Sequence, residues 1–312
     1  MTLRLGTRAS ALAMAQARGV ADALTRATGR PVELVPVTTE GDRSDAPVER
    51  LGVGVFVSAL RDALADKEID LAVHSYKDLP TAPVDGLVVA AVPARVDPGD
   101  ALVARDGLTL AQLPPGARVG TGSPRRAAQL RAHRPDLAVV GLRGNVDTRL
   151  RKVATGELDA VVVACAGLVR LGRTDEITER LDPSVMLPAP AQGALAVECR
   201  EDDGDTAAAV AVLDHPDSRV AVAAERQLLA TLEAGCSAPV AGLAEVRSGP
   251  QGRIVTLHGA VISPDGSRML RRSRTAPVPD GPETVAAAAQ LGRDLAVDLF
   301  AAGARTILES DT

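Results

Sequence analysis

The sequence predicts an α/β protein made of two α/β lobes followed by a small α+β domain. In about the first 95 residues, short apolar runs typical of strands alternate with longer runs typical of helices, and a second such cycle begins near Pro98. Beyond about residue 240, strand-like runs follow one another and one helix-like run comes last. A chain of 312 residues is also too long for one ordinary hydrophobic core, since cores rarely grow past ~250 residues.

The first lobe is expected to alternate strands and helices from its first residues onward. The expected strands are residues 3–6, 32–38 and 70–74, and the expected helices are residues 9–28 and 55–65. Because strands that are separated by helices pair in parallel, this order predicts a largely parallel sheet.

The second lobe repeats this pattern at similar size. Its expected strands are residues 101–105, 118–120, 137–142 and 160–164, and its expected helices are residues 124–133 and 146–155. The proline-rich residues 183–192 end the cycle, and a strand at 194–199 and a helix at 218–233, closed by Gly235, follow it. Ligands of such sheets gather at the carboxyl ends of the strands, so the loops there are the places to look for chemistry.

The last part of the chain has a different pattern. Strand candidates at residues 240–246, 253–262 and 268–275 are separated by Gly, Pro and Asp turns, and Pro282 starts an Ala-rich helix that ends near residue 302. Successive strands followed by one helix predict a small antiparallel α+β domain.

Composition excludes several classes of protein. The net charge of −5 gives no overall basic field for binding nucleic acid, and an aromatic content of 1% leaves almost no side chains for base stacking. No stretch approaches the ~20 apolar residues of a membrane span, and no charged leader precedes an apolar run. We therefore expect a cytoplasmic protein that binds neither nucleic acid nor membrane.

The three cysteines and four histidines show no zinc-binding spacing, so we expect no metal site. Cys165 and Cys199 lie in apolar strand-like or helix-start contexts, where a thiol behaves as a small hydrophobic group. Cys236 differs because it lies between Gly235 and Pro239, in a turn past the end of a helix.

The loop GTGSPRR, residues 120–126, follows an expected strand and opens an expected helix. Its small residues expose backbone N–H groups at a helix N-terminus, and Arg125 and Arg126 add paired charge, which together would bind an anion. An ordinary capped helix with solvated arginines explains the loop equally well.

Positive charge accumulates around that loop. Residues 123–152 contain seven Arg and one Lys against Asp136 and Asp147, an excess of six positive charges in an acidic chain. Within them, RGNVDTR places Arg143 on a loop after a strand and Arg149 in the next helix, and guanidinium groups bind carboxylates bidentately. Three further arginines are expected on a solvated face: Arg131, Arg134 and Arg151.

The loop HSYKDLPT, residues 74–81, directly follows another apolar strand. Lys77 could hold a carboxylate, and Asp78 could transfer protons or stabilise a cation. Neighbouring Lys and Asp are common by chance, so this loop alone does not establish a catalytic site.

Seven segments in order resemble the motif series of the hydroxymethylbilane synthase (porphobilinogen deaminase) family. Each is weak by itself, but their order and spacing are specific and extend along the whole chain. The segments are GTRASALAMAQ, HSYKDLPT, GTGSPRR, RGNVDTRLRK, AGLVRL, PAPAQGALAVECR and AGCSAP.

This resemblance implies three domains. The first two are doubly wound α/β lobes like those of type II periplasmic binding proteins, at residues 1–94 with 194–212 and at residues 97–189, and the third is a small α+β domain at residues 218–312. It also implies stepwise joining of four porphobilinogen molecules with release of ammonia, and hydrolytic release of a linear hydroxymethylbilane. The cofactor of the family is dipyrromethane, bound through a thioether at the position of Cys236, and we expect a monomer.

The resemblance also assigns roles to individual residues. Asp78 stands at the position of the family's catalytic carboxylate, which also contacts the cofactor. Further cofactor contacts match Lys77, Thr121, Ser123, Arg125, Arg126 and Arg149, and substrate contacts match Arg8, Ser10, Arg143, Arg149, Arg170 and Gln192. The chain departs from the family at Val53 and Ser58, where lysines are frequent, and Phe56 matches an aromatic lid position with core packing as an equal alternative. Gly122 and Ala191 stand where serine and glycine are often found.

Two other functions remain as rivals. An architecture of two α/β lobes also occurs in non-enzymatic receptors for carboxylates or other oxyanions. Such a receptor would not explain a third domain that carries Cys236. A phosphate-handling transferase could use GTGSPRR, but neither a Walker lysine motif nor a cluster of metal-ligating carboxylates accompanies it.

Overall fold

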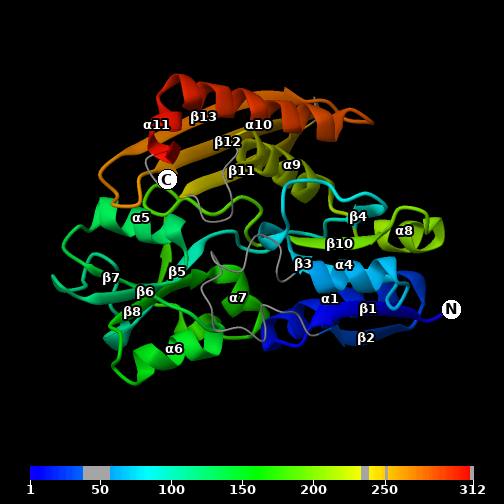
Figure 1. Cartoon of the computed structure of the whole chain (residues 1–312), viewed down its shortest axis with the longest axis horizontal. Coiled ribbons are helices and arrows are strands. Elements are labelled where there is room, and N and C mark those ends of the chain that lie inside the picture. Colours follow the sequence, from blue (N-terminus) through cyan, green and yellow to red (C-terminus); the bar gives the residue numbers. More distant parts are fainter. Residues whose placement is uncertain (38–56, 233–238, 250–251, 310–312) are drawn as a thin grey trace. The chain divides into compact units, whose positions relative to one another are not determined.

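The computed structural model describes residues 1–37, 57–232, 239–249 and 252–309 (Figure 1). The chain divides into two compact units. The first contains residues 1–96 and 193–219, and the second contains residues 97–192 and 220–312.

The first unit is built on a five-stranded sheet in the order β2-β1-β3-β10-β4. β1 pairs in parallel with β2 and β3, whereas β10 runs antiparallel to β3 and β4. The strands are β1 (Leu3–Arg8), β2 (Val32–Val37), β3 (Leu71–Ser75), β4 (Leu87–Ala91) and β10 (Leu195–Arg200), and the helices are α1 (Ala11–Thr28), α4 (Ser58–Ala65), η1 (Tyr76–Asp78) and α8 (Gly204–Ala211).

Helices cover both faces of this sheet. Leu5 and Leu71 pack with α1 in one cluster, while Ala72 packs with α4 in another, because successive residues of a strand point to opposite faces. α1 starts where the Ser10 hydroxyl accepts the Ala13 N–H and stops at Gly29, whose φ of 70° suits a left-handed helix cap.

The second unit contains a sheet of the same size in the order β7-β6-β8-β5-β9. β6 pairs in parallel with β7 and β8, and β5 runs antiparallel to β8 and β9. The strands are β5 (Asp100–Ala104), β6 (Arg118–Thr121), β7 (Ala138–Gly141), β8 (Ala160–Ala164) and β9 (Glu179–Leu181), and the helices are η2 (Arg105–Gly107), α5 (Pro124–His133), α6 (Val146–Ala154), α7 (Cys165–Arg170) and η3 (Thr174–Glu176).

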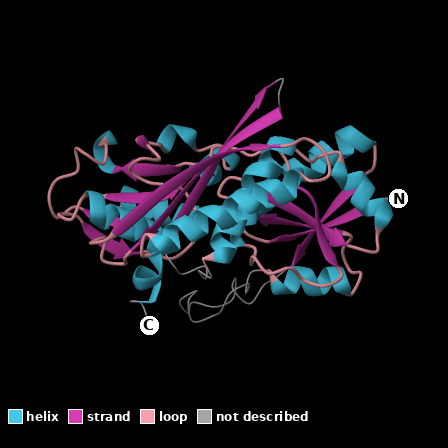
Figure 2. Cartoon of the chain, turned by 90° about the horizontal axis from the view of Figure 1, so that it is seen from above, coloured by secondary structure: helices cyan, strands magenta, loops and turns pink. Residues whose placement is uncertain are grey.

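The same unit includes a three-stranded antiparallel sheet with helices packed on it (Figure 2). Leu228, Leu257 and Leu295 belong to the core between this sheet, α9 and α10. On the other side, Ala128 of α5 packs against Ala241 and Ala260. The elements are α9 (Pro216–Thr231), β11 (Val240–Gly249), β12 (Gly252–Ile262), β13 (Met269–Val278), α10 (Thr284–Ala301) and α11 (Ala304–Leu308).

The predicted fold class, two α/β lobes and a C-terminal α+β part, is confirmed. The expectation of largely parallel sheets was wrong, since two of the four strand pairings in each described five-stranded sheet are antiparallel. The physical reason is that β10 and β5 enter their sheets in the opposite direction, and the short strands β4 and β9, which the sequence analysis missed, pair with them. The boundaries of the three domains stay a prediction.

Candidate active site

Two glycines allow the strands that carry the candidate loops to lie close to their neighbours. A Cβ on Gly6 of β1 would come within 2.3 Å of the Ile69 side chain, and one on Gly120 of β6 would come within 2.6 Å of Leu158. Each contact is far shorter than van der Waals distance, so a side chain at either position would require Ile69 or Leu158 to repack.

In the first unit, the loop after β3 forms the 3₁₀ turn η1, which carries Lys77 and Asp78. The turn is held at its start by the Tyr76 N–H, which donates to Ala194 O at 3.1 Å, and at its end by buried Leu79. Lys77 is half-buried and Asp78 is exposed. A carboxylate on a short anchored turn can meet a substrate without paying much ordering entropy.

The loop after β1 places Arg8 and Ser10 in the same unit. Arg8 is the last residue of β1 and is half-buried. Ser10 is the N-cap of α1, and its hydroxyl accepts the Ala13 N–H at 3.3 Å. Ser10 therefore stabilises the helix, whatever it contributes to binding.

A buried charged cluster lies in the sheet that carries η1. Glu198 of β10 is 2% exposed; it accepts hydrogen bonds from Arg61 of α4, the shortest at 2.8 Å, and its Oε2 lies 3.2 Å from His74 Nε2. Burial would raise the pKa of Glu198, but its interactions with His74 and Arg61 outweigh it and lower that pKa. Because His74 precedes η1 by two residues, the cluster fixes the strand end from which the turn starts.

In the second unit, Arg125 and Arg126 share one buried carboxylate. Asp100, fully buried at the start of β5, lies 2.7 Å from a nitrogen of each guanidinium. Burial alone would raise the pKa of Asp100, but attraction to Arg125 and Arg126 lowers it to about 2. The group therefore carries a net charge of +1 at neutral pH rather than +2.

Gln192 completes this group. Its amide nitrogen donates to Asp100 Oδ1 at 2.8 Å and to Pro98 O at 2.8 Å, and its amide oxygen accepts from Arg126 at 3.3 Å. A buried carboxylate with two cations and an amide is rigid because most of its polar atoms have partners. Gln192 thus orients the guanidinium groups through Asp100.

Further arginines approach the same loops. Arg149, in the first turns of α6, donates from Nε to Gly144 O at 2.8 Å. Its pKa is lowered to about 10 by burial and by repulsion from Arg126 and Arg143, and burial lowers the pKa of Arg170, at the end of α7, to about 10 as well. Both groups stay charged at neutral pH, and a bound anion would stabilise the charge that burial disfavours.

The GTGS segment forms a tight turn into α5. The Ser123 N–H donates to the Thr121 hydroxyl at 3.2 Å, Ser123 is the N-cap of α5, and Pro124 starts the helix. A Cβ on Gly122 would come within 2.4 Å of Leu142 O and 3.5 Å of an Arg149 nitrogen, so glycine lets the loop before α6 approach this turn.

Two of the arginines expected on a solvated face have structural roles instead. Arg131 donates to Pro264 O at 2.7 Å, and Arg134 donates to Leu113 O at 2.8 Å and pairs with Asp136. The expectation was wrong because their carbonyl partners come from distant segments. Arg151 is exposed, as expected.

The cysteine predictions have different outcomes. Cys165 and Cys199 are fully buried free thiols, as expected, and burial raises their pKa values to about 12 and about 11. Cys236 and the lid candidate Phe56, like Val53, lie outside the described residues. Ser58 is described and lies exposed at the start of α4.

Asp100, Arg61 and Glu198 were missed by the sequence analysis. The available signal was a carboxylate in or beside an apolar strand, as in DALVA and LAVECR. Burial of such a group requires a partner, which the linear pattern does not identify.

None of the helices in the described residues is long and apolar enough to cross a membrane. Nor do three His, Cys, Asp or Glu residues of that part of the chain come together as a metal site would require.

Comparison with protein families first defines the class. Residues 3–208 match the family model described as "Porphobilinogen deaminase, dipyromethane cofactor binding domain", and residues 220–301 match "Porphobilinogen deaminase, C-terminal domain". Both sheets that carry the candidate loops lie in the first match. The chain belongs to the porphobilinogen deaminase family.

Curated relatives agree with this assignment over almost the full chain. The porphobilinogen deaminase of Nocardia farcinica is 60% identical over 98% of this chain and 88% of that relative. Porphobilinogen deaminase 1 of Streptomyces coelicolor and the porphobilinogen deaminase of Mycobacterium tuberculosis are each 56% identical over 98% of this chain, and cover 97% and 98% of those relatives.

Among solved structures, the methionine-binding protein MetQ resembles this chain with a TM-score of 0.41 and 13% sequence identity. The likeness covers 68% of this chain and 89% of MetQ. A likeness at this level implies nothing about the ligand.

Proposed function

We propose that this member of the porphobilinogen deaminase family is a hydroxymethylbilane synthase, which joins four porphobilinogen molecules with release of ammonia and then releases linear hydroxymethylbilane by hydrolysis. The observation that carries this proposal is the group of buried or half-buried arginines in the second unit, Arg125, Arg126, Arg149 and Arg170. Each pyrrole of the substrate bears an acetate and a propionate, so a growing chain requires many guanidinium groups.

We propose dipyrromethane, bound through a thioether to Cys236, as the cofactor. The donor set fits this group, since Arg125, Arg126 and Arg149 suit its carboxylates, while Thr121 and Ser123 offer short polar contacts in the same loop. When bound, dipyrromethane supplies the primer to which pyrrole units are added. Cys165 and Cys199 cannot serve as the attachment site, because their thiols are buried and protonated at neutral pH.

Asp78 has the catalytic role in this proposal. Loss of ammonia from porphobilinogen leaves positive charge on a pyrrole ring, and a carboxylate beside that ring stabilises it more in the transition state than in the ground state. The same carboxylate can accept the proton that leaves when the ring α-carbon forms the new bond. Its exposure on an anchored turn supports this role.

The cationic residues divide into two groups by environment. One group holds substrate or cofactor carboxylates and consists of Lys77, Arg8, Arg143, Arg149 and Arg170. Arg125 and Arg126 are oriented by Asp100 and Gln192, which prevents them from turning away before a carboxylate binds. Ser10 contributes through the first turn of α1.

The protein is further proposed to be a cytoplasmic monomer that binds porphobilinogen but neither nucleic acid nor membrane. The predicted division into residues 1–94 with 194–212, 97–189 and 218–312 is kept as a proposal for its domains.

The mass of the intact protein tests the central proposal. The purified chain should be heavier than its translated mass by one dipyrromethane, and Cys236→Ser should abolish both the added mass and the colour reaction for pyrroles. Cys165→Ala is the matched control, because its thiol is buried, and it should keep the added mass. An unmodified native chain that makes hydroxymethylbilane would disprove the cofactor, and a chain without pyrrole or activity would favour the receptor alternative.

A further inference from the structure

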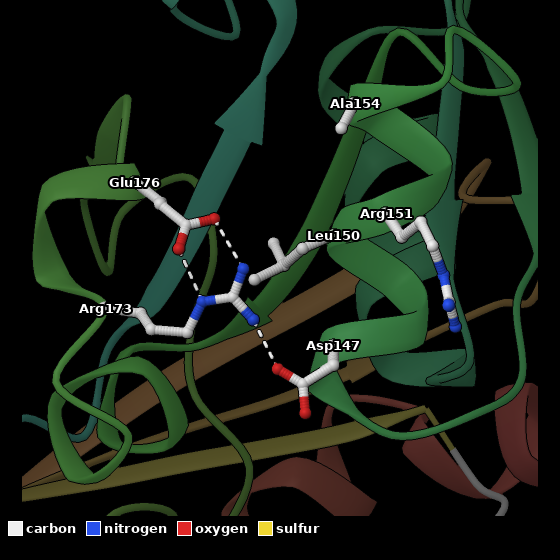
Figure 3. A pocket seen from close by; sticks show the side chains of 6 residues that line it. All are labelled: Asp147, Leu150, Arg151, Ala154, Arg173 and Glu176. Atoms are coloured by element: carbon white, nitrogen blue, oxygen red, sulfur yellow. Dashed lines mark hydrogen bonds and ion pairs between the residues drawn. The ribbon is translucent and has the colours of Figure 1, made fainter.

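Arg173 joins two elements of the second unit through carboxylates. Its Nε and Nη2 donate to Glu176 of η3 at 2.5 and 2.8 Å, and its Nη1 pairs with Asp147 in the first turn of α6 (Figure 3). The bidentate geometry makes this bridge stronger than a single surface ion pair.

The bridge spans a hollow between these elements. A cavity of about 380 Å³ lies there, lined by Asp147, Leu150, Arg151, Ala154, Arg173 and Glu176. Figure 3 shows Arg151 pointing away from Arg173, so it takes no part in the bridge. Leu150 and Leu168 belong to one buried cluster with Ile177 packed against it, so packing joins these segments beneath the hollow, and the ion pairs of Arg173 add a second connection across it.

Arginines of the candidate site lie in α6 and at the end of α7, the helix that precedes η3. Arg149 lies two residues beyond Asp147, and Arg170 lies three residues before Arg173. Arg126 and Arg143 both repel Arg149, so this grouping of guanidinium groups is unfavourable while no anion is bound. The ion pair between Arg173 and Asp147 fixes the first turn of α6, two residues before Arg149.

We propose that Arg173 is a positioning residue, which holds the first turn of α6 against η3 and thereby keeps Arg149 and Arg170 at the separation that substrate carboxylates require. This inference rests on the proposed substrate-binding roles of those two arginines. Its physical basis is preorganisation, because a binding group that is already in place loses less entropy when the ligand arrives.

Arg173→Ala should raise the KM for porphobilinogen about three- to tenfold while kcat stays within about twofold, because an exposed ion-pair network contributes modestly and acts on binding. Arg173→Lys should recover part of the loss, since a cation still reaches Asp147. Asp147→Ala should raise KM by a similar factor, and the double variant should add little to either single one. Amide hydrogen exchange of residues 143–149 should be faster in Arg173→Ala.

Lys152→Ala is the matched control, because Lys152 lies in the last turn of α6, away from Asp147, and pairs with Glu157 beyond the end of the helix. It should leave KM unchanged. An equal rise of KM in Lys152→Ala would show a diffuse basic field, and a native KM in Arg173→Ala would overturn the positioning role. The positioning role would also be overturned if Arg173→Ala had a lower unfolding temperature and a lower kcat but an unchanged KM.

Failure of this inference is distinguishable from failure of the proposed function. If the native chain forms no hydroxymethylbilane, the function itself is wrong. If the native chain is active and Arg149→Lys impairs it while Arg173→Ala does not, only the positioning role is wrong.

Discussion

The two five-stranded sheets share one topology but differ in where they bury a carboxylate. In each sheet a parallel set of three strands is followed by an inserted antiparallel strand and then an edge strand. Gly6 pairs with the second residue of β3, and Gly120 pairs with the second residue of β8. Opposite the last residue of the third strand, however, the first unit has Leu195 and the second unit has Asp100.

The two buried carboxylates therefore have different roles, one in stability and the other in binding. Glu198 lies opposite Ala72, near the start of β3 and away from its carboxyl end, and it pairs there with half-buried Arg61 and buried His74. Asp100 lies at the carboxyl end of the strands, where ligands of such sheets gather, and it holds arginines of the candidate site. The same frame therefore supports a structural ion pair in one lobe and an anion site in the other.

The loops after the third strands differ in the same way. The first unit has a short turn with the exposed carboxylate of Asp78, whereas the second has the six-residue helix α7, which ends with Arg170. One lobe thus offers a group for proton transfer, and the other offers a group that holds carboxylates.

The largest expected effect comes from neutralising each buried carboxylate. Asp100→Asn and Glu198→Gln should each lower the free energy of unfolding by ~3 to 5 kcal/mol, since each leaves a buried cation without its partner. Only Asp100→Asn should also raise the KM for porphobilinogen per folded molecule. Urea unfolding together with steady-state kinetics measures both, and an equal rise of KM in the two variants would remove the distinction between the lobes.

The next effect concerns Asp78. Asp78→Asn keeps the shape of the side chain but removes its charge, so turnover should fall by ~10² or more with little change in unfolding. Asp78→Glu should lose less, because its carboxylate is displaced by one methylene. Turnover must be measured on protein whose mass shows the bound cofactor. A near-native rate for that form of Asp78→Asn would contradict the catalytic role.

A smaller effect is expected when guanidinium groups are replaced by ammonium groups. Arg149→Lys and Arg125→Lys should each lose the bidentate contact proposed with a pyrrole carboxylate, which corresponds to ~1.5 to 3 kcal/mol and roughly a tenfold to hundredfold loss of kcat/KM. Arg151→Lys is the control, because Arg151 is exposed, and its kcat/KM should be nearly unchanged. Arg134 is unsuitable for that purpose, since it donates to two backbone carbonyls. Equal losses of kcat/KM in the Lys variants of Arg149, Arg125 and Arg151 would indicate a diffuse basic field.

The smallest effect is the acid dependence of Asp100. Its pKa is lowered to about 2 in the folded chain, below the ~3.9 of an unfolded aspartate, so its stabilisation is complete above pH ~4 and is lost as pH falls toward 2. The difference in unfolding free energy between the native protein and Asp100→Asn should therefore shrink by about 2 kcal/mol over that range. Unfolding curves at several pH values measure it, and a constant difference would show that Asp100 is not held as a carboxylate.

The sequence by itself determined the features that depend on neighbouring residues. A helix was expected at residues 9–28 and α1 spans Ala11–Thr28, while Pro124 starts α5 and Arg149 falls in α6 as the local pattern predicts. Periodicity predicted most strands because each has to bury apolar residues, and the ordered motifs predicted the family.

The tertiary structure decided which charges meet, because those partners are far apart in the chain. Arg126 lies 26 residues from Asp100, Gln192 lies 92 residues from it, and Arg61 lies 137 residues from Glu198. No local pattern specifies such pairs, since a buried carboxylate requires a cation but not one at a particular spacing. The direction of β5 and β10 was decided in the same way, by the place where the chain enters each sheet rather than by the residues of the strand.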